Sequence, residues 1–150
     1  MSLAIVRAYV ATELETISGI QTAFSDSGGR PLERAPLDNE LPACLLFRGP
    51  STYNRRNTGS SGAHRVVWEL RIELLVSRKG PGIESAIDTL EPFFDSVPLH
   101  FEQNIKLGGN VLTSRILSDN GEIGITYGGE AFLGTHFIMQ IEEDKILSRE

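Results

Sequence analysis

The sequence predicts an α+β domain, with a mostly antiparallel sheet, two helices packed on one face and a long mobile hairpin loop. Two segments carry apolar residues at steps of three and four, which is typical of amphipathic helices. Other segments alternate apolar and polar residues, which is typical of half-buried strands. Short turns join consecutive strands and favour antiparallel pairing. The 150 residues are enough for a single domain, 1–150, with its own core.

The first element is expected to be a helix over Ser2–Ile20. Ser2 is placed to cap its start, and Gly19 follows the last apolar position as a helix-ending residue. A long loop, Asp26–Glu40, is expected next because glycines and prolines are mixed with charged residues there. The apolar stripe of the helix consists of Leu3, Val6, Val10, Leu14 and Ile17.

Two strands and the polar segment between them are expected to form an extended hairpin. Pro42–Phe47 is a short apolar run and is interpreted as a buried strand. Pro50–His64 is rich in Gly, Ser, Asn and Thr, so it is expected to be a loop that stays disordered without a partner. Arg65–Val76 alternates most regularly, with every even-numbered residue apolar. Its opposite face carries Arg65, Glu69, Arg71 and Glu73.

A second amphipathic helix is predicted over Ile83–Phe94, after a turn at Arg78–Gly82. Pro81 suits the start of a helix. Pro92 removes one backbone hydrogen bond and is expected to end or kink the helix. A loop then leads to the next strand, which is predicted over Val111–Leu117.

The last part of the chain is expected to contain two further strands, Ile123–Tyr127 and Ala131–Ile141. The Asn120-Gly121 pair before them tolerates positive φ and is a strong signal for a hairpin. The Gly128-Gly129 pair marks the turn between them. The predicted order is helix, strand, strand, helix and three strands, which favours an antiparallel sheet with both helices on one face.

The charge and the cysteine content argue against several classes of function. The formal net charge of −6 disfavours a dedicated nucleic-acid binder and docking on anionic lipid. No apolar run approaches the roughly 20 residues that a membrane helix needs. The start of the chain lacks the features of a signal peptide. The single cysteine, Cys44, allows no intrachain disulfide and favours synthesis in a reducing, intracellular compartment.

No combination of residues predicts catalysis, and neither a cofactor nor a metal ion is expected. The three histidines, His64, His100 and His136, lack the spacing of a metal-binding helix. Cys44 lies in an apolar strand, where a thiol is usually a small buried hydrophobic group. The glycine pairs match no phosphate-binding loop, and Ser60-Ser61-Gly62 has no nucleophile-elbow context. The chain is therefore not expected to be an enzyme.

A local basic patch is the most suggestive polar feature. Arg55 and Arg56 lie near Arg48 and Arg65 in an otherwise acidic protein. One interpretation is the solvated tip of a loop. The other is a contact arm that pairs with carboxylates of a neighbouring subunit or with a phosphate backbone passing nearby. The residues themselves leave both interpretations open.

Three pieces of the chain, taken in order, resemble a known family. The pieces are Ile17–Ile20 with Leu41–Leu46, His64–Ser77 with Ile83–Phe94, and Ile123–Phe137. Together they resemble the tail terminator, or tail completion, proteins and related minor tail proteins of siphophages and prophages. The resemblance covers Leu3–Glu142. It rests on the order of the elements and on short phrases such as LPAxLL, not on catalytic signatures.

The resemblance implies a structural subunit that assembles into a ring, commonly of six copies. In that family the ring caps the head-proximal end of the tail tube, stops its polymerisation and forms the surface that joins the head. The implied partners are further copies of the chain, the phage tail tube protein and the head–tail connector protein. DNA is implied to pass through without specific binding, and no membrane is involved. The implied location is the tail of the virion, after synthesis in the host bacterial cytoplasm.

The same resemblance suggests where subunits touch. Pro50–Ala63 looks like a mobile segment that becomes ordered in the ring. Charged positions of the following strand could supply ion pairs, although each contributes only about 0–1 kcal/mol at a surface. Apolar residues at the rim are expected to contribute more of the affinity. The predicted interface residues are Tyr53, Arg55, Arg56, Arg65, Glu69, Arg71, Glu73, Phe132 and Ile138.

Three other functions fit parts of the sequence. A head–tail connector, or neck, protein of the virion shares the habit of forming rings from small α+β subunits and differs in what it binds. A small-ligand-binding α+β domain would need convergent polar groups between sheet and helices. A nucleic-acid module would show salt-dependent DNA binding, which the net charge opposes. That module would use Arg48, Arg55, Arg56 and Arg65.

Overall fold

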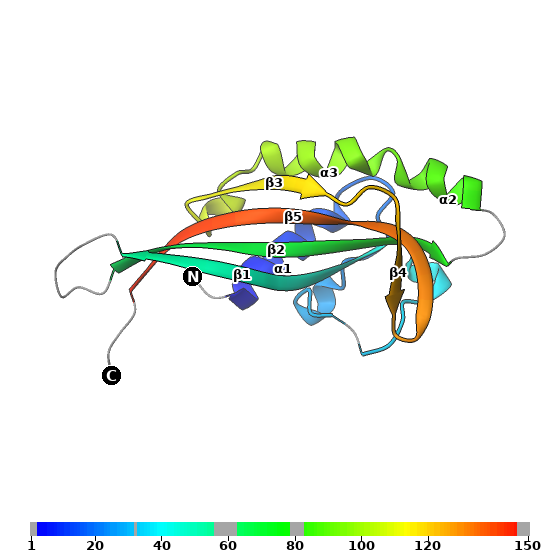
Figure 1. Ribbon diagram of the computed structural model, residues 1–150, viewed down its shortest axis with the longest axis horizontal. Coiled ribbons are helices and arrows are strands. Elements are labelled where there is room, and N and C mark those ends of the chain that lie inside the picture. The colour runs from blue at the N-terminus through cyan, green and yellow to red at the C-terminus, as the bar shows by residue number, and fades with distance from the viewer. Residues whose placement is uncertain (1–2, 32, 56–62, 79–82, 147–150) are drawn as a thin grey trace.

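The computed structural model describes residues 3–31, 33–55, 63–78 and 83–146 (Figure 1). Within them the chain forms a layer of helices on a mostly antiparallel sheet, so the predicted α+β class is confirmed. The helices are α1 (Leu3–Glu15), α2 (Ile83–Leu90) and α3 (Phe93–Glu102). The strands are β1 (Ala43–Arg55), β2 (Ala63–Arg78), β3 (Thr113–Asp119), β4 (Ile123–Tyr127) and β5 (Glu130–Ile146).

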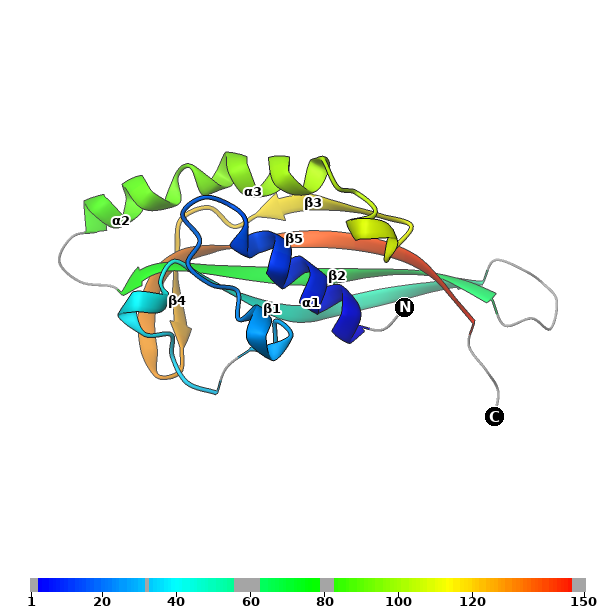
Figure 2. The ribbon, with the colours of Figure 1, turned by 180° about the vertical axis from the view of Figure 1, so that it is seen from behind.

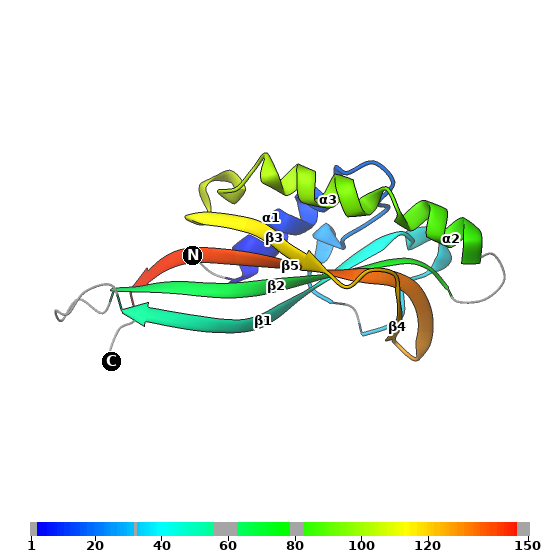
Figure 3. The ribbon, with the colours of Figure 1, turned by 45° about the horizontal axis from the view of Figure 1, so that its top comes forward.

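One five-stranded antiparallel sheet forms the centre of the domain. The strands follow the order β1-β2-β5-β3, and β4 pairs with the first part of β5. Figure 3 shows β3, β5, β2 and β1 side by side in that order. Strands β1, β2 and β5 have 13, 16 and 17 residues, whereas a strand usually has about 5–6 residues. The sheet therefore extends well past the helices at one end.

The helices cover one face of this sheet (Figure 2). The even-numbered residues of β2 from Val66 to Val76 are all buried in this layer, as predicted. Each side chain of this kind stabilises the fold by about 1.5–3 kcal/mol when it is fully buried. The residues of β2 pack in one core with residues of the helices. These are Val6, Val10 and Leu14 of α1 and Phe93, Val97 and Phe101 of α3.

A second, smaller core lies on the opposite face at one end of the sheet. The pairing of β2 with β5 shifts register between Leu75 and Ser77, and such a bulge bends a strand. The bend turns the β4–β5 hairpin away from the helix layer (Figure 1). A Cβ at Gly134, near the bend, would lie 1.9 Å from the carbonyl oxygen of Leu74, so the close approach requires glycine. This core consists of Phe24, Ala35, Ala43, Leu45, Leu75, Ile125 and Phe132.

The polar hairpin loop is shorter than predicted. Strand β1 continues to Arg55, so the first part of the predicted loop Pro50–His64 is strand. Polar residues form a strand here because Ser51–Arg55 pair along residues 64–68 of β2, and an antiparallel sheet tolerates polar side chains on a face that meets water. The predicted mobile tip, residues 56–62, lies outside the described residues.

The first helix ends earlier than the predicted Ser2–Ile20. It stops at Glu15, whose carboxylate accepts hydrogen bonds from Thr22, Ala23 and Ser25 and so fixes the chain in a turn. Gly19 has a φ of 98°, which lies outside the range of a right-handed helix. Ile17 is nevertheless buried, because the turn directs it into the core below the helices.

The loop predicted after the second helix contains a third helix, α3. Pro92 does separate it from α2, but this proline acts as the N-cap of α3. A proline is tolerated at a helix start because its missing N–H would have no intrahelical partner there. Pro98 removes a further hydrogen bond within α3. The packing of Phe93, Val97 and Phe101 against the sheet outweighs that loss.

The Asn120-Gly121 pair is not the hairpin turn that its sequence predicts. Strands β3 and β4 both run antiparallel to β5, so this pair joins two segments that run in the same direction. The Asn120 N–H donates a hydrogen bond of 3.1 Å to the carbonyl of His136 and keeps the chain on β5. The tight hairpin lies at Gly128-Gly129, where φ is 60° and 81°, as in a type I′ turn.

Candidate subunit interface

The face of the sheet that the helices leave free carries most of the predicted interface residues. Odd-numbered residues of β2 and even-numbered residues of β5 alternate onto this face. The register pairs Arg71 with Ile138 and Glu69 with Gln140. We call this surface the open face, and it consists of Arg65, Val67, Glu69, Arg71, Glu73, His136, Ile138, Gln140, Glu142 and Asp144. The structure thus brings the predicted residues of β2 together with Ile138.

Glu73 is the most enclosed charged group of the open face. Its side chain is only 10% exposed, and its Oε1 lies 2.9 Å from Nε2 of His136 and 3.7 Å from Nε of Arg71. The Arg71 guanidinium lies 4.9 Å from the ring centre of Phe47, within range of a cation–π contact. Burial and then the Glu73 charge raise the pKa of Tyr127. Glu73 is therefore engaged inside the subunit and offers little surface to a partner.

Toward the hairpin the open face is more accessible. Arg65 Nε donates a hydrogen bond of 3.0 Å to Oδ1 of Asp144. Val67 and Ile138 lie half-buried between charged neighbours. Exposed ion pairs contribute about 0–1 kcal/mol each and are weakened by salt. The open face thus offers mixed charge around a small apolar centre, which suits contact with another protein surface.

An arm projects beyond the helices at one end of the sheet (Figures 1 and 2). The arm consists of residues 51–55 of β1, 63–67 of β2 and 143–146 of β5. Tyr53 is 51% exposed on it. Arg55, another predicted contact, is the last residue of β1, and Arg56 lies outside the described residues. Of the predicted apolar contacts, Tyr53 has the position that reaches farthest from the body of the subunit.

A bulge sets which residues of β1 share a face. The pairing with β2 shifts register between Arg48 and Ser51. Because of this shift, Arg48 and Tyr53 lie on the same side of β1 although they are five positions apart. That side is continuous with the helix-covered face of the sheet. The Arg48 guanidinium lies 5.3 Å from the ring centre of Trp68 and stays exposed.

The sheet has two edge strands of different character. Strand β1 is covered at its start, where the Cys44 N–H donates a hydrogen bond of 2.9 Å to the carbonyl of Thr22. Farther along, no described strand pairs with its outer side. Strand β3 forms the opposite edge; Leu112, just before it, and Leu117, within it, are 41% and 40% exposed. An unpaired strand edge is a place where a neighbouring chain can add.

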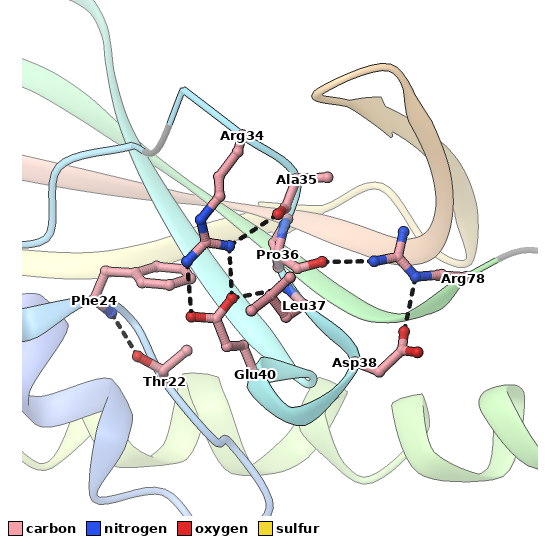
Figure 4. A network of polar contacts seen from close by, with 9 residues as sticks. All are labelled: Thr22, Phe24, Arg34, Ala35, Pro36, Leu37, Asp38, Glu40 and Arg78. Carbon is pink, nitrogen blue, oxygen red and sulfur yellow. Dashed lines mark hydrogen bonds and ion pairs between the residues drawn. The ribbon is translucent and has the colours of Figure 1, made fainter.

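A network of ion pairs fixes the loop before β1 against the end of β2 (Figure 4). Arg34 donates two hydrogen bonds to Glu40, at 2.9 and 3.1 Å. Arg78 donates to Oδ1 of Asp38 at 2.7 Å and to the carbonyl of Pro36 at 2.9 Å. The hydrogen bonds from Arg34 lower the pKa of the Glu40 carboxyl. This network closes the second core and sets the direction in which β1 enters the sheet.

Phe132, a predicted interface residue, offers no surface to a partner in this subunit. It is fully buried in the second core, and the Arg78 guanidinium lies 5.2 Å from its ring centre. The bend of β5 turns this part of the strand inward, under the β4–β5 hairpin. The alternation of the sequence marks Phe132 as apolar but does not reveal which side of a bent strand is covered.

Sequence reasoning missed a row of carboxylates along the outer side of α2 and α3. Its members stand two residues from buried positions, as Asp88 does from Leu90 and Glu91 from Phe93, and so lie on the opposite side of the helix. Residues 83–102 contain no Lys or Arg. The steps of four and three between acidic positions are the signal that could have revealed this row. We call it the acidic ridge, and it consists of Glu84, Asp88, Glu91 and Asp95, with Leu99 continuing the row.

The described residues contain no group of three or more His, Cys, Asp or Glu side chains placed to hold a metal ion. Burial, and then the charge of Glu15, raises the pKa of the Cys44 thiol, so the thiol stays protonated. In the described part of the chain, no helix has the length and apolar character needed to cross a membrane.

Comparison with known proteins identifies no family for this chain. No family model matches the chain, and no curated protein matches it. The resemblance to tail terminators therefore rests on the element order and the short phrases described above.

Proposed function

We propose that the chain is a ring-forming structural subunit of a bacteriophage tail. In this proposal it is a tail terminator, which caps the head-proximal end of the tail tube, stops its polymerisation and forms the surface that joins the head. The observation that carries the proposal is the shape of the sheet, which has two unlike edges and a projecting arm. Unlike surfaces on one subunit favour head-to-tail contacts, and such contacts close into rings when the rotation between copies allows it.

The ring accounts for the two edges of the sheet. In a closed ring, the edge formed by β1 and the edge formed by β3 can both be covered by neighbours, which removes sites of uncontrolled aggregation. The capping of the tube then follows because the two sides of the ring differ. One side of the ring contacts the tube and the other presents a different surface, so no further tube subunit adds. No chemical step is required, and we propose a structural role without catalysis.

The size of the subunit is sufficient for such an assembly. A contact of standard size buries about 800 Å² on each partner. Two contacts on each subunit would cover about a fifth of its 8068 Å² of accessible surface. The affinity should come mainly from partly apolar positions such as Ile138 and Tyr53, because exposed ion pairs contribute little.

Molecular mass in solution tests this proposal. We expect light scattering over a wide concentration range to show a species several times the 16.5 kDa monomer, and negative-stain images to show rings with a central hole. If the protein is monomeric alone, addition of tail tubes should place it at one tube end. Binding to portal or neck proteins instead of tubes would favour the connector function. A monomer that binds neither would contradict the proposal.

A further inference from the structure

Arg7 of α1 carries a buried hydrogen-bond donor without an acceptor in the described part of the chain. Its side chain is partly buried, and its Nε is enclosed without a hydrogen-bond partner. Arg71 and Arg78 also have a buried nitrogen outside hydrogen-bond geometry, but each of them lies beside a carboxylate. A buried donor on a charged group costs free energy when nothing accepts from it. Arg7 therefore lacks the acceptor that the other two arginines have.

A second arginine, Arg30, adds charge of the same sign at this place. Arg30 is exposed and directly follows Gly29, which packs on α1. Burial, and then the charge of Arg30, lowers the pKa of Arg7. Neither arginine forms an ion pair among the described residues. Two guanidinium groups thus repel each other in a chain whose net charge is −6.

The turn that carries Arg30 is fixed on the helix that carries Arg7. A Cβ at Gly29 would lie 2.9 Å from the carbonyl oxygen of Arg7 and 3.1 Å from its Cγ, so this position requires glycine. The N–H of Gly29 donates a hydrogen bond of 3.0 Å to the carbonyl of Phe24. The Glu15 carboxylate holds the start of the same turn through two backbone N–H groups. The turn therefore lies beside α1 (Figure 2) and keeps the two arginines together.

The two guanidinium groups match the chemistry of a phosphate group. Each guanidinium presents parallel N–H donors that can pair with two oxygens of an oxyanion. A phosphate group carries a charge of about −1.5 to −2 at neutral pH, which balances two arginines, whereas a carboxylate balances one. The phosphates of a DNA backbone carry one charge each and belong to a polyanion that the net charge of the chain repels. A phosphate group of a small molecule is therefore the ligand that the pair favours.

We propose that Arg7 and Arg30 form a binding site for a phosphate group, supplied as inorganic phosphate or as the terminal phosphate of a small molecule. Of the three Arg7 nitrogens, only Nε is buried without a partner, so the two terminal nitrogens are accessible to the ligand. A rotation of the guanidinium about its stem brings Nε to a second phosphate oxygen, and Arg30 closes the site from the solvent side. The site uses no residue of the open face, so it does not depend on the ring.

Titration with inorganic phosphate tests the site. At constant ionic strength, set with sodium chloride, calorimetry should show one site with a Kd of about 1 mM or tighter. Bound phosphate should also raise the midpoint of thermal unfolding. Arg7→Met and Arg30→Ala should each weaken binding by at least about tenfold, because each removes one of the two forks. Arg7→Lys should weaken it by about threefold or more, since an ammonium group has no planar fork.

The matched control is Arg115→Ala. Arg115 is exposed on β3, so this variant loses the same charge at another place. Its phosphate binding should stay within about twofold of the original protein, because a single distant surface charge is screened by salt. Loss of binding in this control equal to that in Arg30→Ala would mean that only net charge matters, which would overturn the site.

Stability without phosphate distinguishes a binding role of Arg7 from a structural one. Met keeps an unbranched stem under the turn but removes a partly buried charge that repels Arg30. In phosphate-free buffer of low salt, Arg7→Met should therefore unfold at the temperature of the original protein or above it. A lower midpoint together with unchanged phosphate binding would show that Arg7 only supports the fold, and the proposal would fail.

The choice of anion identifies the source of the phosphate group. Adenosine monophosphate that binds at least about tenfold more tightly than inorganic phosphate would assign the ligand to a phosphorylated small molecule. Equal binding of the two would assign it to inorganic phosphate. Acetate that binds as tightly as phosphate would overturn the assignment to phosphate. A DNA duplex that binds through these two arginines, while inorganic phosphate does not bind, would overturn the small-molecule site in favour of a nucleic-acid contact.

Discussion

Replacement of Glu15 should destabilise the fold more than its surface position suggests. The carboxylate accepts hydrogen bonds from the N–H of Ala23 at 2.9 Å, from the N–H and hydroxyl of Ser25, and from the hydroxyl of Thr22 at 3.2 Å. It thereby holds the segment that pairs with the start of β1. Hydrogen bonds to a charged group contribute about 1.5–3 kcal/mol each when buried. Because Glu15 is only partly buried, we expect Glu15→Ala to lower the free energy of unfolding by about 2 kcal/mol in total.

The pH dependence of the free energy of unfolding distinguishes the contribution of the Glu15 charge from that of the size and shape of its side chain. Partial burial raises the pKa of Glu15, but the hydrogen bonds from Ser25, Ala23 and Thr22 outweigh it, and the pKa falls below its usual value of 4.5. A carboxyl with a lowered pKa stabilises the folded state above its unfolded pKa and loses that contribution as the pH falls. The deficit of Glu15→Gln should therefore be constant near neutral pH, at about 1 kcal/mol. It should shrink as the pH drops below 4.5.

Urea denaturation at a series of pH values measures this effect. The midpoint of thermal unfolding should also fall by about 4–8 °C for Glu15→Ala in a domain of this size. Glu33→Gln is the matched control, because Glu33 is exposed and its replacement should change nothing. If Glu15→Ala has the free energy of unfolding and the pH profile of the original protein, the carboxylate does not hold the loop and the reasoning fails.

Four further substitutions and the reactivity of one thiol test the packing. Gly128→Ala should destabilise by about 2 kcal/mol or more, because φ is 60° and a Cβ would lie 2.3 Å from the backbone of the loop before β1. Gly129→Ala, with open space around it, should cost about 1 kcal/mol, and equal losses in the two variants would contradict the close approach. Phe132→Ala should cost about 3–5 kcal/mol in chemical denaturation, whereas the exposed Leu117→Ala should stay within about 0.5 kcal/mol. The Cys44 thiol should react with a thiol reagent only at the rate of unfolding, because it is buried and its pKa is raised, and rapid reaction in the folded protein would refute this.

The regular parts of the fold could be predicted because one local signal dominates each of them. The alternation of β2 survives in the structure, since the same even-numbered residues that look apolar in sequence are buried from Val66 to Val76. Strand β4 has the bounds that the flanking glycines indicate, Ile123–Tyr127. These elements depend on periodicity and on turn residues, both of which are local.

The predictions fail where contacts between residues far apart in the sequence determine the structure. Asn120-Gly121 has the local chemistry of a hairpin, but β5 pairs with the segments on both sides of it. The polar start of the predicted loop becomes strand because β2 offers pairing partners. Phe132 is covered by a hairpin that folds back over a bend. The shared face of the charged β2 positions follows from their alternation, whereas the acidic ridge is missed because the predicted helix, Ile83–Phe94, stops before Asp95 and Leu99.

Capping of a growing tail tube is the most direct test of the central claim. Tail tube protein of a phage or prophage would be polymerised with and without this chain, and tube lengths and ends would be measured by electron microscopy. We predict tubes that stop growing, each with a ring at one end only. Tubes that grow to the same lengths in excess of the protein, with bare ends, would contradict a tail terminator.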